Sequence, residues 1–201
     1  MKGYSIIYMV LFVACKHAVN NADTVIAAPL KIPTISVSST DSLLQLKNGV
    51  WYYGQHLFCG SINTYYSSGK LRSQLSVYNG KEEGMTNSFY ENGNKEACRY
   101  YHAGEKDSVH RGWWLNGQPR FEYHFRKGEY DGDFKEWYAS GKPYKHIIYA
   151  SGKEQRGKGW RENGKLYMNF VMREGRLYGL MNPNLCYSLK NEKGEYINSL
   201  K

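Results

Sequence analysis

The sequence predicts an all-β fold that consists mainly of about five tandem β-hairpins of 23 to 24 residues each. Composition is the first observation, because the 201-residue chain holds 19 Tyr, 21 Gly and 5 Trp but only 5 Pro, a mixture typical of short strands and turns. Regular spacing of the glycines is the second observation. The third is an alternation of apolar and polar residues after each spaced glycine, as in a half-buried strand.

Two series of glycines mark the repeat. Gly69, Gly93, Gly117, Gly141 and Gly164 are separated by 24, 24, 24 and 23 residues. Each is followed eleven residues later by another glycine, at positions 80, 104, 128, 152 and 175. Gly49 and Gly60 show the same interval and indicate a degenerate half-unit before the first full hairpin.

Each glycine of the first series follows Ser or Asn, as in Ser68-Gly69 and Asn92-Gly93. These dipeptides favour two-residue type I′ turns, because Asn and Gly tolerate a positive φ. The following strand alternates, with Leu75 and Val77 on one face in the first unit, so each unit is predicted to be a hairpin with one apolar face. Arg99 breaks this alternation and indicates a local opening or a snorkelling side chain.

An aromatic residue stands four positions before each glycine of the first series: Tyr65, Phe89, Trp113, Trp137 and Trp160. With two-residue turns, this row shares a face with Arg72 and Arg120, opposite the face of Leu75 and Val77. The row and the two arginines are the candidate binding residues, acting by stacking and cation–π contact. Alternatively the row is the packing of the sheet itself, and a one-residue bulge in the turns would reverse the facing.

The stretches GMTNSFYENG (residues 84–93) and GDFKEWYASG (residues 132–141) resemble the MORN repeat, in the variant of the YwqK family of bacterial proteins. The likeness covers about residues 58–179. It implies an elongated, twisted, single-layer antiparallel sheet of successive hairpins rather than a closed barrel. The chain departs from it at Ser108, where the other units have Gly84 and Gly132, and in the fifth unit, which is one residue short near Gly157.

The first fifteen residues have the features of an export signal. Met1 and Lys2 precede an apolar stretch from Tyr4 to Ala14 that ends at Cys15. The ending FVAC resembles a bacterial lipobox, which implies cleavage before Cys15 and lipidation of its sulfur. An ordinary cleaved signal and an uncleaved buried strand are the alternatives. No apolar run reaches the roughly 18 residues that a membrane span needs, which excludes a polytopic membrane protein.

Four segments are therefore expected along the chain: a lipoprotein signal peptide (1–15), a flexible tether (16–47), the hairpin repeat domain with its caps (48–189) and a C-terminal tail (190–201). Residues 16–45 have no aromatic side chain and no clear period, which is typical of a linker. A short strand at Thr34 to Val37 is the alternative within it. The expected location is the cell envelope, with a lipid anchor in the membrane, the outer membrane in a Gram-negative bacterium.

The sequence offers no catalytic or metal-binding constellation. Histidines 102, 124 and 146 are 22 residues apart, but the strand spacing separates neighbouring imidazoles by about 12 Å, too far for a shared metal ion. Cys59, Cys98 and Cys186 are separated by several strands, so no intrachain disulfide is expected. The segment from Asp131 to Asp133 is interpreted as the link between two units. We expect neither an enzyme, nor a cofactor, nor a metal.

The expected function is binding, as a non-catalytic MORN-repeat scaffold whose partner is another protein or an envelope component. The resemblance implies an alternative, because YwqK-like proteins are commonly described as antitoxins of toxin–antitoxin systems, and the partner would then be a toxin. The net charge of +9, from 27 Lys and Arg against 18 Asp and Glu, makes an acidic partner, a polyanion or a membrane surface conceivable. The mixed signs and the export signal argue against nucleic acid.

Overall fold

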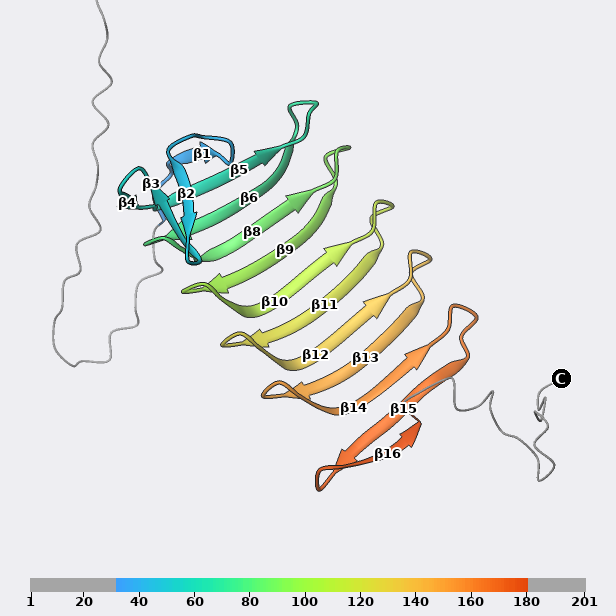
Figure 1. The fold of residues 1–201 in the computed structure, drawn as a ribbon. Coiled ribbons are helices and arrows are strands. Elements are labelled where there is room, and N and C mark those ends of the chain that lie inside the picture. The colour runs from blue at the N-terminus through green and yellow to red at the C-terminus, as the bar shows by residue number, and fades with distance from the viewer. Residues whose placement is uncertain (1–31, 181–201) are drawn as a thin grey trace, which may run out of the picture. The chain divides into compact units, whose positions relative to one another are not determined.

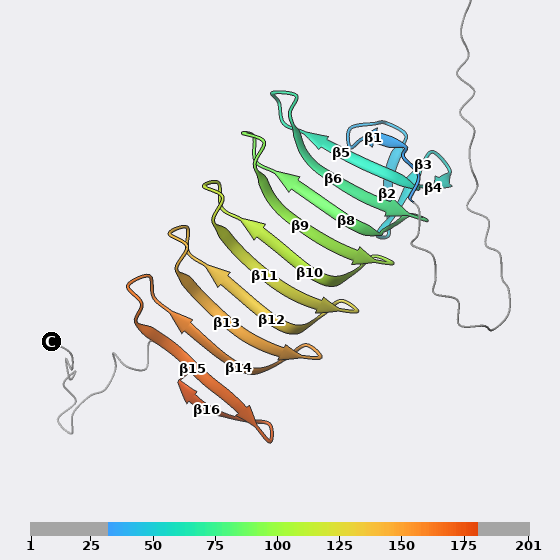
Figure 2. The same cartoon turned by 180° about the vertical axis from the view of Figure 1, so that it is seen from behind.

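The computed structural model describes residues 32–180, and every regular element in this range is a β-strand. The expected lipidation site at Cys15 lies outside these residues, as do Cys186 and the tail at 190–201. Thirteen strands form one large sheet and three form a small second sheet. Figures 1 and 2 show the large sheet from its two sides as a single layer of successive hairpins. No helix that could cross a membrane occurs between residues 32 and 180.

The strands, in chain order, are β1 (Ser36–Ser38), β2 (Leu44–Lys47), β3 (Val50–Tyr53), β4 (His56–Leu57), β5 (Gly60–Tyr65), β6 (Leu71–Tyr78), β7 (Lys81–Glu82), β8 (Gly84–Phe89), β9 (Lys95–His102), β10 (Glu105–Trp113), β11 (Pro119–Arg126), β12 (Glu129–Trp137), β13 (Pro143–Ala150), β14 (Lys153–Trp160), β15 (Leu166–Arg173) and β16 (Arg176–Leu180). From β5 onward, strands adjacent in sequence are adjacent and antiparallel in the sheet, except that the short β7 extends the pairing of β6. The predicted all-β array of hairpins is therefore confirmed.

Two strands fall in the described part of the range expected as a tether. The first, β1, pairs in parallel with β5, and β2 forms the small sheet with β3 and β4. Val37 and Leu44 from these strands pack against a buried cluster of Phe58, Ile62 and Val77. Strand β1 overlaps the short strand considered at Thr34 to Val37, whereas the four residues of β2 are too few to show a clear hydrophobic period, so the sequence pattern does not reveal it.

The turns of the first glycine series differ from the prediction of two-residue type I′ turns. The Gly69 amide donates to the Tyr66 carbonyl oxygen at 2.9 Å, and the Tyr66 amide donates to that of Lys70 at 2.8 Å. Gly69 has a φ of 80°, whereas Ser68 has no positive φ. This geometry is a type I turn followed by a left-handed glycine. In the second unit, the Asn92 side chain accepts the Asn94 amide at 2.9 Å, so this Asn supplies a hydrogen bond rather than a positive φ.

Type I′ turns instead occur in the second glycine series. Asn79 and Gly80 have φ angles of 50° and 76°, and the residues on either side of them, Tyr78 and Lys81, pair directly. The same pair of positive φ angles recurs at Ala103-Gly104, Lys127-Gly128, Ser151-Gly152 and Glu174-Gly175. The glycine amide also reaches the preceding unit, as from Gly104 to the Glu82 carbonyl oxygen at 2.8 Å. Each of these turns therefore connects two hairpins.

The loops of the first series are followed by a bulge that affects which side chains share a face. Thr64 pairs with Ser73, but Tyr65 pairs with Leu71, so Arg72 is the extra residue. Comparable register shifts precede Phe89, Trp113, Trp137 and Trp160. A bulge changes the facing of the residues beyond it. Arg72 and Arg120 are therefore the extra residues of two bulges, and the expectation that regular cross-strand pairing places them on the face of the aromatic row is wrong.

Two faces result from this register. One carries Val77, Tyr123, Phe125, Ile147 and Phe170 and is called the aromatic face. The other carries Arg111, Glu122, Lys135 and Lys158 and is called the charged face. As predicted, strand alternation places the row from Tyr65 to Trp160 on the face opposite Val77. This is the charged face.

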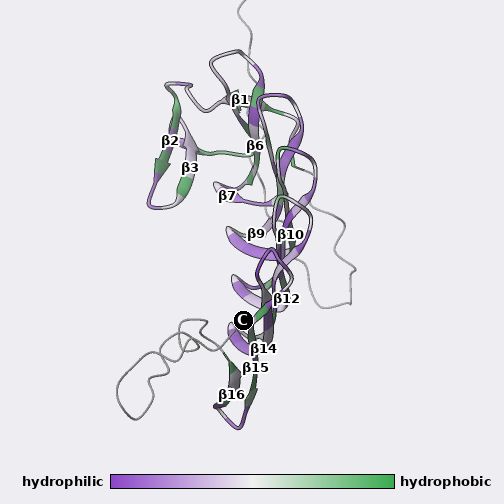
Figure 3. Ribbon diagram, turned by 90° about the vertical axis from the view of Figure 1, so that its right-hand side faces the viewer, coloured by the Kyte–Doolittle hydropathy of each residue, from purple (hydrophilic) through white to green (hydrophobic). Residues whose placement is uncertain are grey.

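The buried core lies on the aromatic face in two clusters. Phe58, Ile62 and Val77 form the first, beneath the small sheet, which Figure 3 shows beside the large sheet at the β6 end. Ile147, Met168 and Phe170 form the second, toward the C-terminal end. Between them the aromatic face of β9 to β13 has no covering sheet within the described residues, and the candidate site lies there.

Glycines within the strands make room for rings on this face. The Phe121 ring lies over Gly112, where a Cβ atom would clash with it. A Cβ atom at Gly157 would lie 2.6 Å from the Phe170 ring. Such rings replace the missing glycine side chain in covering the backbone, which explains why this sequence is rich in both glycine and aromatic residues.

The segment Asp131 to Asp133 lies inside β12, not in a link between units. Gly132 has a φ of 108°, and the pairing with β11 shifts register at this point. Gly84 occupies the equivalent position with a φ of 76°, and Ser108 does so with a φ of 56°. This bulge recurs every 24 residues, and Ser108 adopts it without the conformational freedom of glycine.

Replacing Ser108 by glycine is expected to raise the free energy of unfolding by about 0.5 to 1 kcal/mol, since left-handed strain of about 1 kcal/mol or more is relieved and part is offset by backbone entropy. The melting temperature should rise by about 2 to 4 °C per kcal/mol. Ser88, which has no positive φ, provides the matched control. Ser88→Gly should lower the melting temperature, because no strain is relieved there and glycine adds backbone entropy to the unfolded chain. A lower melting temperature for Ser108→Gly would show that Ser108 is not strained.

Candidate functional site

The predicted aromatic row does not form a stack. Tyr65 is 49% exposed and the other four members are half-buried. Within residues 32–180, none of the five rings makes a stacked or edge contact with another aromatic ring. Equivalent positions are two strands apart, about 9.6 Å, which agrees with this separation.

Each member of the row except Tyr65 accepts a hydrogen bond through its backbone carbonyl oxygen. The donors are the neighbouring aromatic residues of the preceding unit: Tyr66 to Phe89 at 2.8 Å, Tyr90 to Trp113 at 2.8 Å, Trp114 to Trp137 at 3.0 Å and Tyr138 to Trp160 at 3.0 Å. Tyr and Trp carry a polar donor on an apolar ring. The pair of aromatic residues in each unit thus fastens one hairpin to the next.

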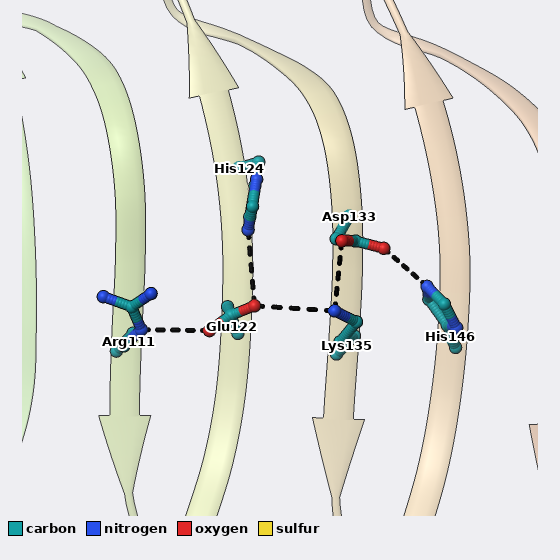
Figure 4. Close-up of polar contacts among 6 residues, drawn as sticks. All are labelled: Arg111, Glu122, His124, Asp133, Lys135 and His146. Atoms are coloured by element: carbon teal, nitrogen blue, oxygen red, sulfur yellow. Dashed lines mark hydrogen bonds and ion pairs between the residues drawn. The ribbon is translucent and has the colours of Figure 1, made fainter.

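The charged face carries a ladder of ion pairs across four strands (Figure 4). Glu122 accepts from Arg111 at 2.9 Å, and Asp133 contacts Lys135 at 3.0 Å and His146 at 2.6 Å. Burial raises the pKa of the Asp133 carboxyl, but hydrogen bonds from His146 and Lys135 outweigh it, and the pKa is lowered. Because opposite charges alternate along this ladder, its charges are satisfied within the protein.

The aromatic face contains an open hollow of about 440 Å³ over β9 to β13. Its lining consists of aromatic side chains, three cations, one histidine and one carboxylate: Arg99, Lys106, His110, Trp114, Arg120, Phe121, Tyr123, Phe125, Tyr130, Glu136, Trp137 and Tyr144. The volume is within the usual range for ligand sites, roughly 300 to 1,000 Å³. This hollow is the candidate functional site.

Contacting rings form the floor of the hollow. Tyr123 stacks on Phe121 with ring centroids 4.6 Å apart, and Phe125 stacks on Tyr130 at 4.5 Å. Tyr123 also stacks on Phe134 at 4.2 Å. Aromatic contacts of this kind contribute about 0.5 to 1.5 kcal/mol each beyond the area they bury, so the floor is a preformed surface.

Three cations lie over ring faces around this floor. The Arg99 guanidinium is 5.8 Å from the Phe121 centroid, and the Arg120 guanidinium is 4.8 Å from that of Trp114. The Lys106 ammonium is 5.2 Å from the Phe125 centroid. None of the three forms an ion pair with a residue in the described range.

The only carboxylate lining the hollow, Glu136, is already engaged. It accepts the Tyr123 hydroxyl at 2.6 Å and lies 3.7 Å from the Lys145 ammonium. Burial, together with the Glu136 carboxylate, raises the pKa of Tyr123 well above its usual range, so Tyr123 keeps its proton. The hollow therefore carries an excess of positive charge.

His110 lies beneath the hollow and is only 2% exposed. Its Nε2 is 2.7 Å from the Tyr100 carbonyl oxygen, and its ring lies 4.5 Å from that of Phe125. Burial lowers the pKa of the imidazole, and the charges of Arg99 and Lys106 lower it further, although hydrogen bonds to the backbone of Tyr100 and Asp107 oppose them. His110 is therefore a neutral structural side chain that donates through Nε2.

This lowered pKa gives a pH dependence of stability. Below about pH 6.5 the unfolded chain protonates its histidines, whereas folded His110 resists protonation. Its contribution is thus complete above about pH 6.5 and is lost as the pH falls through the folded pKa. We expect His110→Gln to flatten the decline in free energy of unfolding between about pH 7.5 and 5.5, measured by urea denaturation. Equal slopes for both proteins would contradict this.

The sequence-predicted site residues are divided between the two faces. Arg120 borders the hollow, and so does Trp137, although the register of β12 places it with the row on the charged face. Tyr65, Phe89, Trp113, Trp160 and Arg72 do not border it. Arg72 instead lies 5.6 Å over the Tyr66 ring. The break in alternation at Arg99 was a further signal of the hollow, since this cation stands where other units place an apolar side chain.

The histidines and cysteines flagged in the sequence lie apart. His102 contacts Glu83, and His146 contacts Asp133. No group of three His, Cys, Asp or Glu side chains within the described residues could hold a metal ion. Within residues 32–180, Cys59 and Cys98 form no disulfide, and the Cys59 sulfur accepts the Asn79 amide at 3.1 Å.

A comparison with models of known protein families identifies the repeating unit. Residues 130–151 match the MORN repeat variant. This MORN repeat spans nearly all of β12, the whole of β13 and the loop between them. A search of curated proteins found no significant match. The other hairpins share the turns and bulges of this MORN repeat, and the match suggests a repeat-containing binding or scaffold module.

Proposed function

We propose that this protein is a non-catalytic scaffold of the cell envelope that binds a partner protein through its aromatic face. The single observation that supports this is the hollow, an aromatic floor surrounded by three cations without ion pairs. Trp, Tyr and Arg are the residues that most often dominate protein–protein binding energies. Repeated hairpins form an extended surface on which such a site is held rigidly.

The composition of the hollow supports binding rather than catalysis. Its lining includes no Ser, Thr or Cys that could act as a nucleophile. The carboxylate of Glu136 is held by Tyr123 and Lys145. The imidazole of His110 is buried and bonded to a backbone carbonyl. An acid–base pair poised toward a substrate is therefore absent from this lining.

Attachment to the membrane through Cys15 is part of the proposal and rests on the sequence FVAC after a short apolar stretch. Growth with a labelled fatty acid should label the wild-type protein but not Cys15→Ala. Label that persists in Cys15→Ala would refute lipidation at this cysteine without affecting the binding proposal.

Photo-crosslinking tests the binding surface directly. A photoreactive phenylalanine analogue is placed at Tyr144, which borders the hollow, or at Trp113 on the charged face as the matched control. Irradiation of cells should link a defined protein to the position of Tyr144 but not to that of Trp113. No protein adduct at Tyr144, or adducts from the charged face alone, would refute the proposal. The antitoxin-like role is the outcome in which the captured protein is a toxin that this chain neutralises.

A further inference from the structure

We infer that the hollow binds an acidic peptide segment in which carboxylates alternate with aromatic or other apolar side chains. This inference rests on the proposed function and specifies the chemistry of the partner. It follows from three features of the hollow: the unused donors of its cations, the contrast with the opposite face, and the exposed rings between the cations.

The cations of the hollow have unused hydrogen-bond donors. Arg99 from β9, Lys106 from β10 and Arg120 from β11 each lie over a ring face. Contact with a ring face does not use the N–H groups at the edge of a guanidinium. Within the described residues, no side-chain hydrogen bond or ion pair involves any of the three. They are therefore available to bind carboxylates, which arginine can hold with two parallel bonds.

In the ladder of the charged face, by contrast, cations have carboxylate partners within the protein. There Arg111 pairs with Glu122, and Lys135 lies between Glu122 and Asp133. On the aromatic face, burial raises the pKa of the Glu82 carboxyl, and the positive charge of Arg99 partly opposes this increase. Glu82 nevertheless does not reach ion-pair distance of Arg99. A half-buried cation without a carboxylate partner is costly, and an incoming carboxylate would remove that cost.

The rings select a peptide over a small inorganic anion. Arg99 and Arg120 come from strands two positions apart in the sheet, about 9.6 Å, and the rings of Phe121 and Tyr123 lie beside them in the hollow. An extended peptide repeats its side chains on one side every 6.6 to 6.8 Å or so, so two carboxylates with one apolar side chain between them on that side lie about 13 Å apart. Flexible arginine side chains can follow this spacing. Two carboxylates can then reach the cations while an apolar side chain between them covers the rings.

The test uses the full chain and a fluorescein-labelled random copolymer of glutamate and tyrosine, which presents many acidic and aromatic sequences at once. Binding is measured by fluorescence anisotropy. The hollow variant is Arg99→Gln/Lys106→Gln/Arg120→Gln. The matched control is Arg156→Gln/Lys158→Gln/Arg173→Gln, which removes the same charges from exposed positions on the charged face.

The wild-type protein should bind the copolymer, and the hollow variant should bind at least about tenfold more weakly, since charge-assisted hydrogen bonds are lost. The control should remain within about twofold of wild type, because exposed charges away from the site act only at long range. Arg120→Gln alone, at an exposed position, should weaken binding by about threefold or more, and it guards against misfolding of the triple variant. Circular dichroism melts report the folding of each variant.

Three outcomes would overturn the inference. One is equal weakening in the two triple variants, which would show binding by net charge alone. Another is no binding of the copolymer up to about 1 mM. A third is tighter binding of an acidic polysaccharide such as hyaluronate, in competition with the copolymer. If the position of Tyr144 captures a protein while the copolymer does not bind, the acidic-peptide inference fails and the proposed function survives.

Discussion

Replacing Phe170 by alanine is expected to lower the free energy of unfolding by about 3 to 5 kcal/mol. The Phe170 ring is only 4% exposed and belongs to the cluster with Ile147 and Met168. It also covers the backbone of Gly157, which has no side chain of its own to fill the space. The cavity therefore opens on two sides and cannot close without moving β14, so the cost should lie at the upper end of this range.

Phe170→Ala should also show where along the chain stability is lost. Repeat arrays are stabilised by contacts between neighbours, so a defect in one unit spreads poorly to distant ones. Hydrogen exchange should show faster opening of β14 to β16, while β5 and β6, which pack in the other cluster, keep their protection. Asn169→Ala, at an exposed adjacent position on the opposite face, provides the control. Uniform loss of protection along the chain would contradict independent clusters.

Replacing Gly60 by alanine is expected to cost about 2 to 3 kcal/mol, from the sum of backbone strain and a steric clash. Gly60 has a φ of 152°, and a Cβ atom there would overlap the Ile35 carbonyl oxygen and lie 3.0 Å from the Phe58 ring. The Ile35 oxygen accepts the Ser61 amide at 2.8 Å. Since the clash is with backbone, relief requires β1 to move away from β5.

Gly54→Ala is the control that separates the cost of backbone strain from the cost of the steric clash. Gly54 has a φ of 63° but no atom within 4 Å of its Cβ position, so Gly54→Ala should cost only about 1 kcal/mol. Urea denaturation of both variants, with hydrogen exchange at Val37, measures the difference. Equal costs for the two substitutions would mean that the contact between Gly60 and Ile35 contributes nothing to stability.

The array of hairpins could be predicted because its period is marked by glycines at positions where few other residue types are tolerated. Glycine at a left-handed position, as at Gly69 and Gly93, has strong physical reasons to recur. The turn types could not be predicted from the dipeptides alone. Asn92 has two ways to stabilise a turn, and the structure uses its side-chain oxygen. Ala103, in contrast, adopts a positive φ that its side chain does not favour.

The candidate site was harder to predict, because bulges decide which side chains meet. Arg120 was expected beside Trp113, yet it lies over Trp114 and borders the hollow. The rings that form the floor, such as Tyr123 and Phe125, look in the sequence like ordinary members of an apolar strand face. Only Arg99 was visibly out of place. Arg99, an irregular charge within a regular repeat, therefore marks the hollow together with Arg120 and Trp137 of the predicted set.

The hydrogen bonds between units have a consequence for how this protein can change over generations. Ring donors reach acceptors 22 or 23 residues ahead, and turn glycines reach acceptors 22 residues behind, at equivalent places in successive units. Recombination between two matching codons removes or adds one whole hairpin, and each donor then finds an equivalent acceptor in its new neighbour. The number of hairpins can thus vary by unequal crossing-over while these hydrogen bonds between units are kept.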